Sequence, residues 1–599
     1  AIVGALLSAS DLTAGTADAR KALSAVENGD TESARLSLES ARQHLDRADG
    51  VLGPATLAAR LVPSLAQHVT ALDIALGESR NITKAADGLL ASADYDRLRY
   101  RGRIDIAQLR ALSPDASDVH EVLTRAEGRL TEAGAPWLVG PVRDRLDELH
   151  SEVSDVQAAS GLASHVLEVA PALFGGDGDR RYLVVFMTPA ELRGGGGFIG
   201  SYAELLASDG RFRLAESGPI RDLIYHGEFG DRTLNGPTEY LSRYGRFHTV
   251  DYIQDVTLSP HFPYNAEVLA QLYPQAGGSP VDGVIGIDPI GLAALLELTG
   301  PVQVEGRDEP LTAENAADFL TRDQYLEFLE EGDGSWEEYD RLNEERRDFL
   351  AAATTATFEE LTRASLPAPA EIGAALGPAA RGRHIQVWSR RSAEQELLER
   401  VDADSALDIP DGFDGFELVQ QNAGNDKLDA YLQRTIEYTA EIDPASGRLT
   451  GTVRATLENN VPSDIPPRIA GRRVDVPGTS RTWLTLFTHH GIVSASLDGR
   501  PMSVGWEEEV GLNAYDTPFI EIPPGESVTL EFVLDGWVDL SDGYELRIFP
   551  QPVANPDVVE LDVSLTDGRF TGPDSTAGAV VYSDPMVEPI TAQAQVLKG

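Results

Sequence analysis

Hydrophobic and polar positions follow three different patterns along this chain, and the first pattern is helical. Over residues 1–172, small and apolar side chains recur at spacings of four and three, as in Ala34, Leu38, Ala41, Leu45, Ala48 and Leu52. Such a seam is typical of a helix in a bundle or coiled coil, and the Gly-Pro pair after Leu52 is expected to end this helix. Similar seams over 61–76, 119–130 and 142–173 predict three more helices. We therefore expect an N-terminal helical bundle or coiled coil, with a stalk as its simplest role.

The second pattern alternates strands with helices over residues 176–427. The stretch "VDGVIGIDPIGLAALLELTG" (281–300) predicts a buried strand and then a helix capped by Asp288, with proline at its first position. Thr312 is the expected cap of the next helix, and a longer helix follows it. Asp209 and the glycine after it form a hairpin-turn dipeptide. Other strands are expected at residues 181–188, 198–208, 211–217, 302–306 and 383–389. This alternation predicts an α/β domain.

The third pattern is a series of short strands over residues 428–599. Segments such as "YLQRTIEYTAEID" and "ESVTLEFVLDG" alternate in polarity and are separated by turn residues at fairly even spacing. This spacing is typical of a β-sandwich, most often a structural or adhesive module. The expected fold class is therefore a multidomain α+β protein with a helical bundle, a central α/β domain and a C-terminal β-sandwich.

Composition excludes several kinds of chemistry. The 599 residues include no cysteine, so disulfides, thiolate metal sites and cysteine nucleophiles are absent. The net charge of −47 leaves no basic excess for nucleic acid. The opening "AIVGALLSA" is apolar but too short to span a bilayer. It is either the start of a helix or the outer end of a membrane anchor that lies upstream.

The candidate chemistry lies in arginines at the ends of predicted elements. Arg193 precedes four glycines in "ELRGGGGFIGSY", and the N–H groups of Gly195, Gly196 and Gly197 could form an anion nest beside it. Other arginines in such places are Arg221, Arg341, Arg346, Arg347, Arg390 and Arg391. Strand ends are where α/β sheets build ligand sites, and arginine suits forked contacts with phosphate. The alternative is that each arginine pairs with a surface carboxylate.

Several ordered blocks resemble the family called domain of unknown function 4012. They include "YLVVFMTPAELRGGGGFIGSYAEL", "VDGVIGIDPIGLAALLELTGPV" and "QQNAGNDKLDAYLQRTIEY". The resemblance covers residues of about 180 to 560. It implies a membrane anchor at the N-terminus and an outward-facing body at the cell membrane or wall. The activity of this family is not settled.

A weaker resemblance concerns the LytR-CpsA-Psr enzymes, which transfer glycopolymers from polyprenyl-pyrophosphate lipids to the cell wall. Arg221 and Asp222 match their Pro-Arg-Asp segment, and Asp340, Arg341, Arg346 and Arg347 loosely match an arginine-rich helix. The resemblance implies that arginines hold the pyrophosphate and that carboxylates bind Mg²⁺. Here Ser201 stands within Gly-Ser-Tyr where those enzymes have Arg-Ser-Asp, so one metal-binding aspartate is missing. Ser201 could ligate weakly, Glu204 or Asp222 could substitute, or magnesium binding is lost.

Three hypotheses follow. In the first, the protein is a transferase that binds a lipid-linked glycan: Arg193, Arg221, Arg346 and the glycine N–H groups neutralise the diphosphate, and Asp222 acts as base or metal ligand. Ser201, Arg341 and Arg347 complete this predicted binding site. In the second, the protein is a non-catalytic envelope scaffold that binds cell-wall polysaccharide or another protein. The third is a glycoside hydrolase, which needs two carboxylates facing each other across a cleft.

Overall fold

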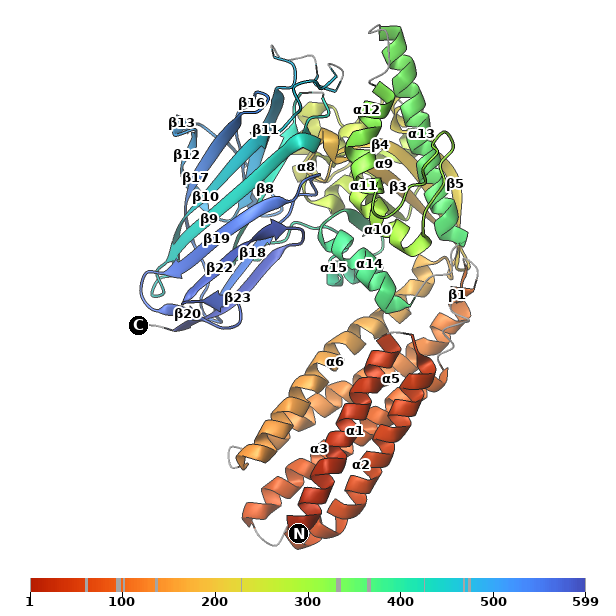
Figure 1. Ribbon diagram of the computed structural model, residues 1–599, viewed down its shortest axis with the longest axis vertical. Helices are drawn as coiled ribbons and strands as arrows, with labels where there is room; N and C mark the ends of the chain where they lie inside the picture. Colours follow the sequence, from red (N-terminus) through yellow and green to blue (C-terminus); the bar gives the residue numbers. More distant parts are fainter. Residues whose placement is uncertain are drawn as a thin grey trace. The chain divides into compact units, whose positions relative to one another are not determined.

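A computed structural model shows a chain that forms two compact units (Figure 1). The first comprises residues 1–180, 207–212 and 362–374, and the second comprises 181–206, 213–361 and 375–599. The structure describes residues 2–27, 29–59, 63–92, 99–100, 103–134, 138–227, 229–329, 336–363, 368–424, 426–466, 469–471 and 476–597. Within some of these elements, chiefly near residues 2–10, 51–65 and 339–340, only the backbone is described.

The N-terminal unit is built from long helices, as the sequence predicts. They are α1 (Ile2–Glu27), α2 (Thr31–Ala59), α3 (Pro63–Ser92), α5 (Ile106–Ala133) and α6 (Gly140–Leu173). The predicted seam of α2 is buried from Ala34 to Ala48, because α2 packs against both α1 and α3. The expected end of α2 at Gly53-Pro54 is wrong, since the helix continues to Ala59. A proline removes one backbone hydrogen bond, and contacts with neighbouring helices can outweigh that loss. Among the described helices, none combines the length and apolar content needed to cross a membrane.

A small β element of this unit was not predicted. Strands β1 (Arg99–Tyr100) and β2 (Arg103–Ile104) pair with each other, and Arg103 of β2 pairs with Arg211. The Arg103 guanidinium also binds the Asp209 carboxylate in the predicted hairpin turn. Two-residue strands carry too little periodicity to be detected in a sequence.

The second unit contains a sheet in the order β5-β4-β3-β6-β7. Its strands are β3 (Arg180–Thr188), β4 (Phe198–Ser208), β5 (Arg211–Pro219), β6 (Gly283–Ile287) and β7 (Ile385–Ser389). Strands β3 and β6 are parallel, and β7 runs antiparallel to β6. The Asp288 carboxylate caps the helix after β6 by accepting from the N–H groups of Ile290 and Gly291, as predicted. The predicted strand at 302–306 is wrong, since these residues contribute only an isolated bridge from Val302 to Leu311.

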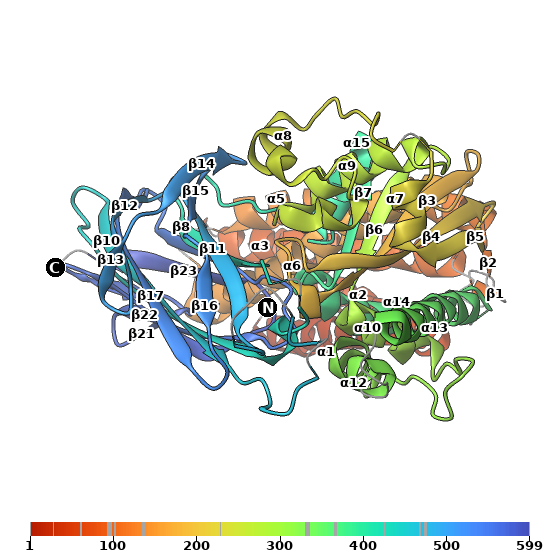
Figure 2. The ribbon, with the colours of Figure 1, turned by 90° about the horizontal axis from the view of Figure 1, so that it is seen from above.

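Helices cover both faces of this sheet (Figure 2). Helix α9 (Phe262–Gln275) packs on one face, where Leu183 and Val185 of β3 share its buried core. Helices α10 (Pro289–Thr299) and α13 (Trp336–Arg363) cover the other face, and Phe186 of β3 meets Phe358 of α13 edge-to-face. The shorter elements are η1 (Pro189–Glu191), α7 (Ile220–Tyr225), α8 (Thr238–Tyr244), η2 (Gly245–Phe247), η3 (Ile253–Leu258), α11 (Ala316–Asp318), η4 (Phe319–Asp323), α12 (Gln324–Leu329), α14 (Pro369–Arg381) and α15 (Ser392–Arg400).

The C-terminal region is rich in strands, as predicted, and forms two sheets. One has the order β13-β12-β17-β10-β9-β19-β22-β21, and the other has the order β14-β15-β11-β8-β18-β23-β20, with β16 beside β11. Strand β8 (Asp414–Asn422) pairs with β11 and β18. Strand β8 thus belongs to this sheet, although it lies before residue 428, where the sequence places the start of the strand series. Sequence periodicity could not separate β8 from the preceding α/β pattern, because all nine residues of β8 are buried.

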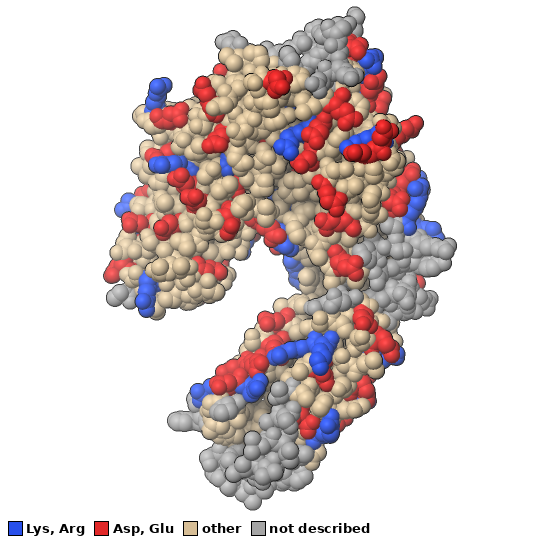
Figure 3. Space-filling view, in the orientation of Figure 1, with Lys and Arg blue, Asp and Glu red and all other residues tan. Residues whose placement is uncertain are grey.

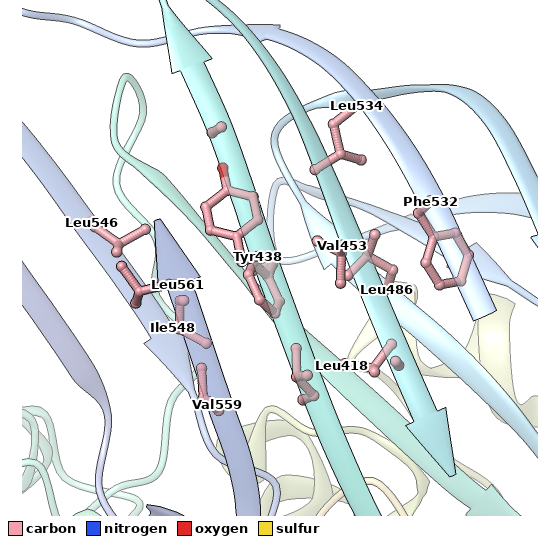
Figure 4. Packing of buried hydrophobic residues seen from close by; sticks show 14 of the residues in the cluster. Leu418, Tyr438, Val453, Leu486, Phe532, Leu534, Leu546, Ile548, Val559 and Leu561 are labelled. Carbon is pink, nitrogen blue, oxygen red and sulfur yellow. The ribbon is translucent and has the colours of Figure 1, made fainter. Parts of the chain in front are cut away.

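Apolar side chains from both sheets share one core (Figure 4). Leu418, Leu486 and Ile548 extend from the sheet that contains β8, and Tyr438 and Phe532 extend from the other. The remaining strands are β9 (Leu432–Ile442), β10 (Arg448–Asn459), β11 (Ser480–Thr488), β12 (Gly491–Leu497), β13 (Arg500–Met502), β14 (Gly505–Glu509), β15 (Leu512–Asp516), β16 (Ile520–Ile522), β17 (Ser527–Trp537), β18 (Tyr544–Phe549), β19 (Asp557–Leu565), β20 (Arg569–Thr571), β21 (Ser575–Thr576), β22 (Ala579–Met586) and β23 (Ile590–Leu597). A short helix, η5 (Asp429–Tyr431), precedes β9.

Buried ion pairs join the central elements to the strand-rich region. Arg243 of α8 is 3% exposed, and its guanidinium lies 3.2 Å from Glu509 and 2.6 Å from Asp516. Arg383 binds Glu417 of β8 at 2.8 Å, with both side chains buried. Buried charges are costly to separate from their partners, so these pairs favour one fixed packing of the two parts.

The glycine-rich loop lies between these parts. The N–H of Gly194 donates to the Gln421 side chain on β8, and that of Gly195 donates to the Thr257 carbonyl on η3. A Cβ atom at Gly194 would overlap the Leu258 carbonyl, and one at Gly197 would overlap the Thr188 carbonyl. Glycine is therefore required here because the loop packs backbone against backbone.

We expect Gly197→Ala to lower the free energy of unfolding by more than about 3 kcal/mol, because it adds both a steric overlap and a strained φ of +139°. The matched control is Gly277→Ala, where φ is also positive but no atom lies within 4 Å of the added Cβ. That variant should cost about 1 kcal/mol. Urea unfolding followed by tryptophan fluorescence measures both, and equal losses would contradict the packing argument.

Candidate functional site

A cavity of about 510 Å³ lies in the second unit, at the carboxyl ends of the parallel strands β3 and β6. Thr188 and Asp288 line it at these strand ends, and Ser201 lines it from β4. Arg221 of α7 and Arg346 of α13 also line it. The carboxyl edge of parallel strands is the usual ligand site of an α/β sheet.

Most of the cavity wall is apolar. The sheet contributes Phe186, Phe198 and Ile287, and α10 and α13 contribute Leu292 and Leu350. Apolar walls with a few charged groups are typical of small-molecule sites. The wall therefore suits an extended hydrocarbon group.

Arg346 is a buried cation held by neutral partners. Its Nε and Nη2 atoms donate to Asn343 Oδ1 at 3.1 and 3.0 Å, and Nη1 donates to Gln324 Oε1 at 3.2 Å. The side chain lies over the Tyr325 ring, 4.7 Å from its centroid. Within the described part of the chain, no carboxylate lies within ion-pair distance of Arg346. Burying a guanidinium without an anion beside it costs free energy, which a bound anion would offset.

Lys427 adds a second cation to this end of the cavity. It follows β8, its Nζ lies 5.8 Å from the Tyr325 centroid, and it forms an ion pair with Glu191 of η1. Burial alone would lower the pKa of Lys427, but Glu191 and Tyr325 outweigh burial and raise it, so the amine stays charged. We call Arg346, Lys427, Glu191 and Tyr325 the inner cluster. It holds two cations and one carboxylate.

Sequence reasoning found Arg346 but missed Lys427 and Glu191. Both are charged residues in irregular segments, where no periodicity or spacing marks them as site residues. Only the packing of η1 against the chain that follows β8 brings them together.

The mouth of the cavity is closer to neutral than the inner cluster. Arg221 Nη2 donates to Glu344 Oε1 at 2.6 Å, and Asp222 lies 3.9 Å from Arg221. The hydrogen bond to Glu344 raises the pKa of Arg221. Arg347 also lines the cavity and lowers the pKa of Glu344 after the larger effect of Arg221. Carboxylates therefore offset the charge of the predicted catalytic Arg221.

Other predicted site residues lie elsewhere. Arg193 binds Asp255 at 2.8 Å and does not line the cavity. The N–H groups of Gly195 and Gly196 donate to the carbonyls of Thr257 and Arg193, so they are engaged within the protein rather than presented to an anion. Gly197 does not line the cavity either. Arg341 is exposed and bound to two glutamates of its own helix.

The carboxylates at the cavity do not fit a magnesium site. Glu191 is paired with Lys427, and Asp288 caps α10 and lies 2.6 Å from His384. Asp222, the predicted metal ligand, is 46% exposed and is not among the lining residues. Among the described residues, no three His, Asp or Glu side chains gather to hold a metal ion. The side chain of Asp340 lies outside the described residues.

The face shown in Figure 3 does not suggest a polyanion-binding surface over its described residues. On the side shown in Figure 3, acidic side chains are spread among fewer basic ones over the described residues. This distribution agrees with the net charge of −47. Inside the cavity, in contrast, Arg346 is a buried cation whose described hydrogen-bond partners are neutral amides.

A buried pair of aspartates flanks Lys427. The Asn422 amide donates to Asp426 at 2.9 Å and to Asp429 at 2.6 Å, and Asp429 also accepts from the N–H of Leu192 at 2.9 Å. Burial and the neighbouring Asp429 raise the pKa of Asp426 to about 7. Burial raises the pKa of Asp429 to about 6. Through these hydrogen bonds the pair links the loop of Lys427 to the chain after Glu191.

Comparisons with known proteins support the predicted family. Residues 177–325 match the family model described as "Protein of unknown function (DUF4012)", which confirms the resemblance noted in the sequence. No curated protein matches the chain.

Solved structures give only weak likenesses. An M1 zinc metallopeptidase from Deinococcus radiodurans is 14% identical over 30% of this chain and 39% of its own, with a TM-score of 0.15. Leukotriene A4 hydrolase from Saccharomyces cerevisiae is 9% identical over 28% of this chain and 29% of its own, with a TM-score of 0.18. The chain thus spans well under half of these structures, and likenesses this low carry no argument about fold or function.

The aspartate pair predicts a pH-dependent stability. A carboxylate whose folded pKa is raised stabilises the protein fully below its unfolded pKa, and this contribution is lost as pH rises through the folded value. We therefore expect the free energy of unfolding to fall between about pH 4 and pH 7, by up to about 1.4 kcal/mol per pH unit for each proton released, and the melting temperature to fall with it. Glu417, whose pKa burial raises to about 7, contributes in the same direction.

Asp426→Asn should flatten this pH dependence, because the asparagine Oδ1 can still accept from the Asn422 amide and the Leu428 N–H and the side chain does not titrate. Asp464→Asn, at an exposed position, is the control and should leave the profile unchanged. Differential scanning calorimetry across the pH range tests this expectation. A wild-type profile that rises toward pH 8 would contradict it.

Proposed function

We propose that the second unit, which carries the DUF4012 match, binds an amphiphilic anion of the polyprenyl phosphate or pyrophosphate class in its cavity. The observation that carries this proposal is the inner cluster: Arg346 is buried, Lys427 is mostly buried, and among the described ion pairs Arg346 has none and Lys427 pairs with Glu191. All four residues of the cluster line a cavity whose wall is mostly apolar. A ligand with an anionic head and a hydrocarbon chain satisfies both surfaces at once.

The two surfaces favour the same binding mode. Charge-assisted hydrogen bonds from a guanidinium and an ammonium to phosphate oxygens are strong where water is excluded. The chain would lie along Phe198, Leu292 and Leu350, and burying each methylene contributes about 0.8 kcal/mol. Neither the head nor the chain alone would use the whole cavity.

The broader proposal places this binding at the bacterial cell envelope. In it, an anchor upstream of this chain holds the protein at the membrane, outside the cytoplasm. The central domain has a LytR-CpsA-Psr-like fold and the strand-rich region a β-sandwich fold. The ligand is then a lipid-linked glycan or its cell-wall acceptor. The family resemblance and the position of the cavity support these statements.

A transferase activity would extend this binding. An acceptor hydroxyl would form a new P–O bond to the phosphate that carries the glycan, and the prenyl phosphate would leave. Arg221 at the mouth would neutralise charge that develops on the phosphates, and Asp222 beside it would take the hydroxyl proton. In this proposal Arg346 and Lys427 bind the anionic head directly, without a magnesium ion.

The alternative is a non-catalytic envelope protein that binds the same amphiphile, a cell-wall polysaccharide or another protein. Two observations favour it over transfer. Tyr202 stands where the related enzymes have an aspartate, and the lining carboxylates Glu191 and Asp288 are both paired. The same pairing disfavours a glycoside hydrolase, which needs two carboxyl groups free to act on a sugar.

Farnesyl pyrophosphate is a soluble probe for this site. We expect it to bind the purified protein, whereas farnesol and inorganic pyrophosphate, each with half of its chemistry, should bind at least about tenfold more weakly. Isothermal titration calorimetry measures the three affinities. A repeat with Mg²⁺ tests the predicted metal, and an unchanged dissociation constant would show binding without it.

Arg346→Met should weaken farnesyl pyrophosphate binding by about 10- to 100-fold, because it removes charge-assisted hydrogen bonds while keeping most of the side-chain volume. Arg341→Met is the matched control, since it makes the same change on the same helix at an exposed position outside the cavity. It should bind as the wild type does. Equal affinities for Arg346→Met and Arg341→Met would contradict binding at the inner cluster.

A further inference from the structure

We propose that Glu191 occupies the ligand's anion position in the free protein, and that an entering phosphate replaces it at Lys427. This inference rests on the proposed function and adds a determinant of ligand charge to it. Glu191 would act as an internal anion that neutral amphiphiles cannot displace. The argument rests on the geometry of η1, on the charges of the inner cluster and on a comparison with the cavity mouth.

Glu191 is held in place by its backbone rather than by its carboxylate. It closes η1, directly after β3, where Ala190 is fully buried. The next N–H, that of Leu192, donates to the Asp429 carboxylate at 2.9 Å. The contact that the structure describes for the Glu191 carboxylate is its ion pair with Lys427. The side chain can therefore turn away from Lys427 while η1 stays in place.

The charges of the inner cluster favour such an exchange. Glu191 pairs with Lys427, whereas Arg346 holds only the neutral oxygens of Asn343 and Gln324. A phosphate at this point can accept from Lys427 and Arg346 together, because both cations lie within 6 Å of the Tyr325 ring centroid. Glu191 contacts only one of them. A ligand phosphate thus makes contacts that the internal carboxylate does not.

The exchange implies discrimination by charge. A neutral head group leaves the Glu191–Lys427 pair intact and gains no ionic contact. A phosphate must compete with Glu191, so part of its interaction energy is used to displace that carboxylate. Removing the carboxylate charge should therefore strengthen binding of anions and leave binding of neutral amphiphiles almost unchanged.

The cavity mouth supplies a matched comparison. Glu344 pairs with Arg221 as Glu191 pairs with Lys427, but its side chain is 55% exposed, against 10% for Glu191. Exposed ion pairs contribute little because water screens them. The same substitution at these two positions therefore separates competition inside the cavity from a general change of net charge.

The test compares Glu191→Gln with Glu344→Gln in calorimetric titrations with farnesyl pyrophosphate and with farnesol. We expect Glu191→Gln to bind farnesyl pyrophosphate about tenfold more tightly than the wild type, and Glu344→Gln to differ from it by less than about threefold. Farnesol binding should be equal in all three proteins. Melting temperatures without ligand show whether each variant is folded, and Glu191→Gln should melt lower because its two cations are less neutralised.

The outcomes separate this inference from the proposed function. If the wild type binds farnesyl pyrophosphate but Glu191→Gln binds it equally or more weakly, the carboxylate supports the site rather than competing for it, and the inference is wrong. If Glu191→Gln binds more weakly because it does not fold, Glu191→Asp serves as the second variant. It keeps the charge and should bind farnesyl pyrophosphate as the wild type does. If neither protein binds the probe, both the inference and the proposed function are wrong.

Discussion

The close backbone packing of residues 194–197 is the constraint on which the rest of the second unit depends. The loop leaves β3, passes between η3 and β8, and has no room for side chains at Gly194 or Gly197. By packing against both β8 and η3, the loop holds the central sheet directly against the strand-rich region. Buried pairs such as Arg383–Glu417 add charge complementarity to this contact. The two parts consequently form one compact unit.

The same packing creates the inner cluster. Glu191 lies just before the loop and Lys427 lies just after β8, so the contact that orders the loop also brings these residues together. The Asp426–Asp429 pair holds the chain on both sides of this contact. A site with two cations thus exists inside a strongly acidic protein, because Arg346 is buried beside neutral amides and Lys427 is mostly enclosed.

The sequence predicted the fold well where a periodic pattern runs over many residues. Prediction failed where the element is very short or where every residue of it is buried. The helical seams gave α2 and α5, and the Asp288-Pro289 start gave α10. The Gly-Pro pair did not end α2, because helix contacts outweigh a local breaker. Strand β8 was not predicted, because it is buried on both faces and its sequence shows no alternation. Of the predicted site residues, Arg221, Ser201, Arg346 and Arg347 line the cavity, and Lys427 and Glu191 line it without having been predicted.

The sequence by itself determined the helical N-terminal region, the strand-rich C-terminal region, the family match and the absence of cysteine chemistry. These depend on local spacing and composition, which any reader of the chain can count. Only the tertiary structure decided which charges remain without partners. Arg193 and Arg341 are neutralised by Asp255 and by glutamates one helical turn away, while Arg346 is buried beside neutral amides. Pairing in space cannot be read from spacing in sequence, because with 96 carboxylates each arginine has many possible partners and packing selects among them.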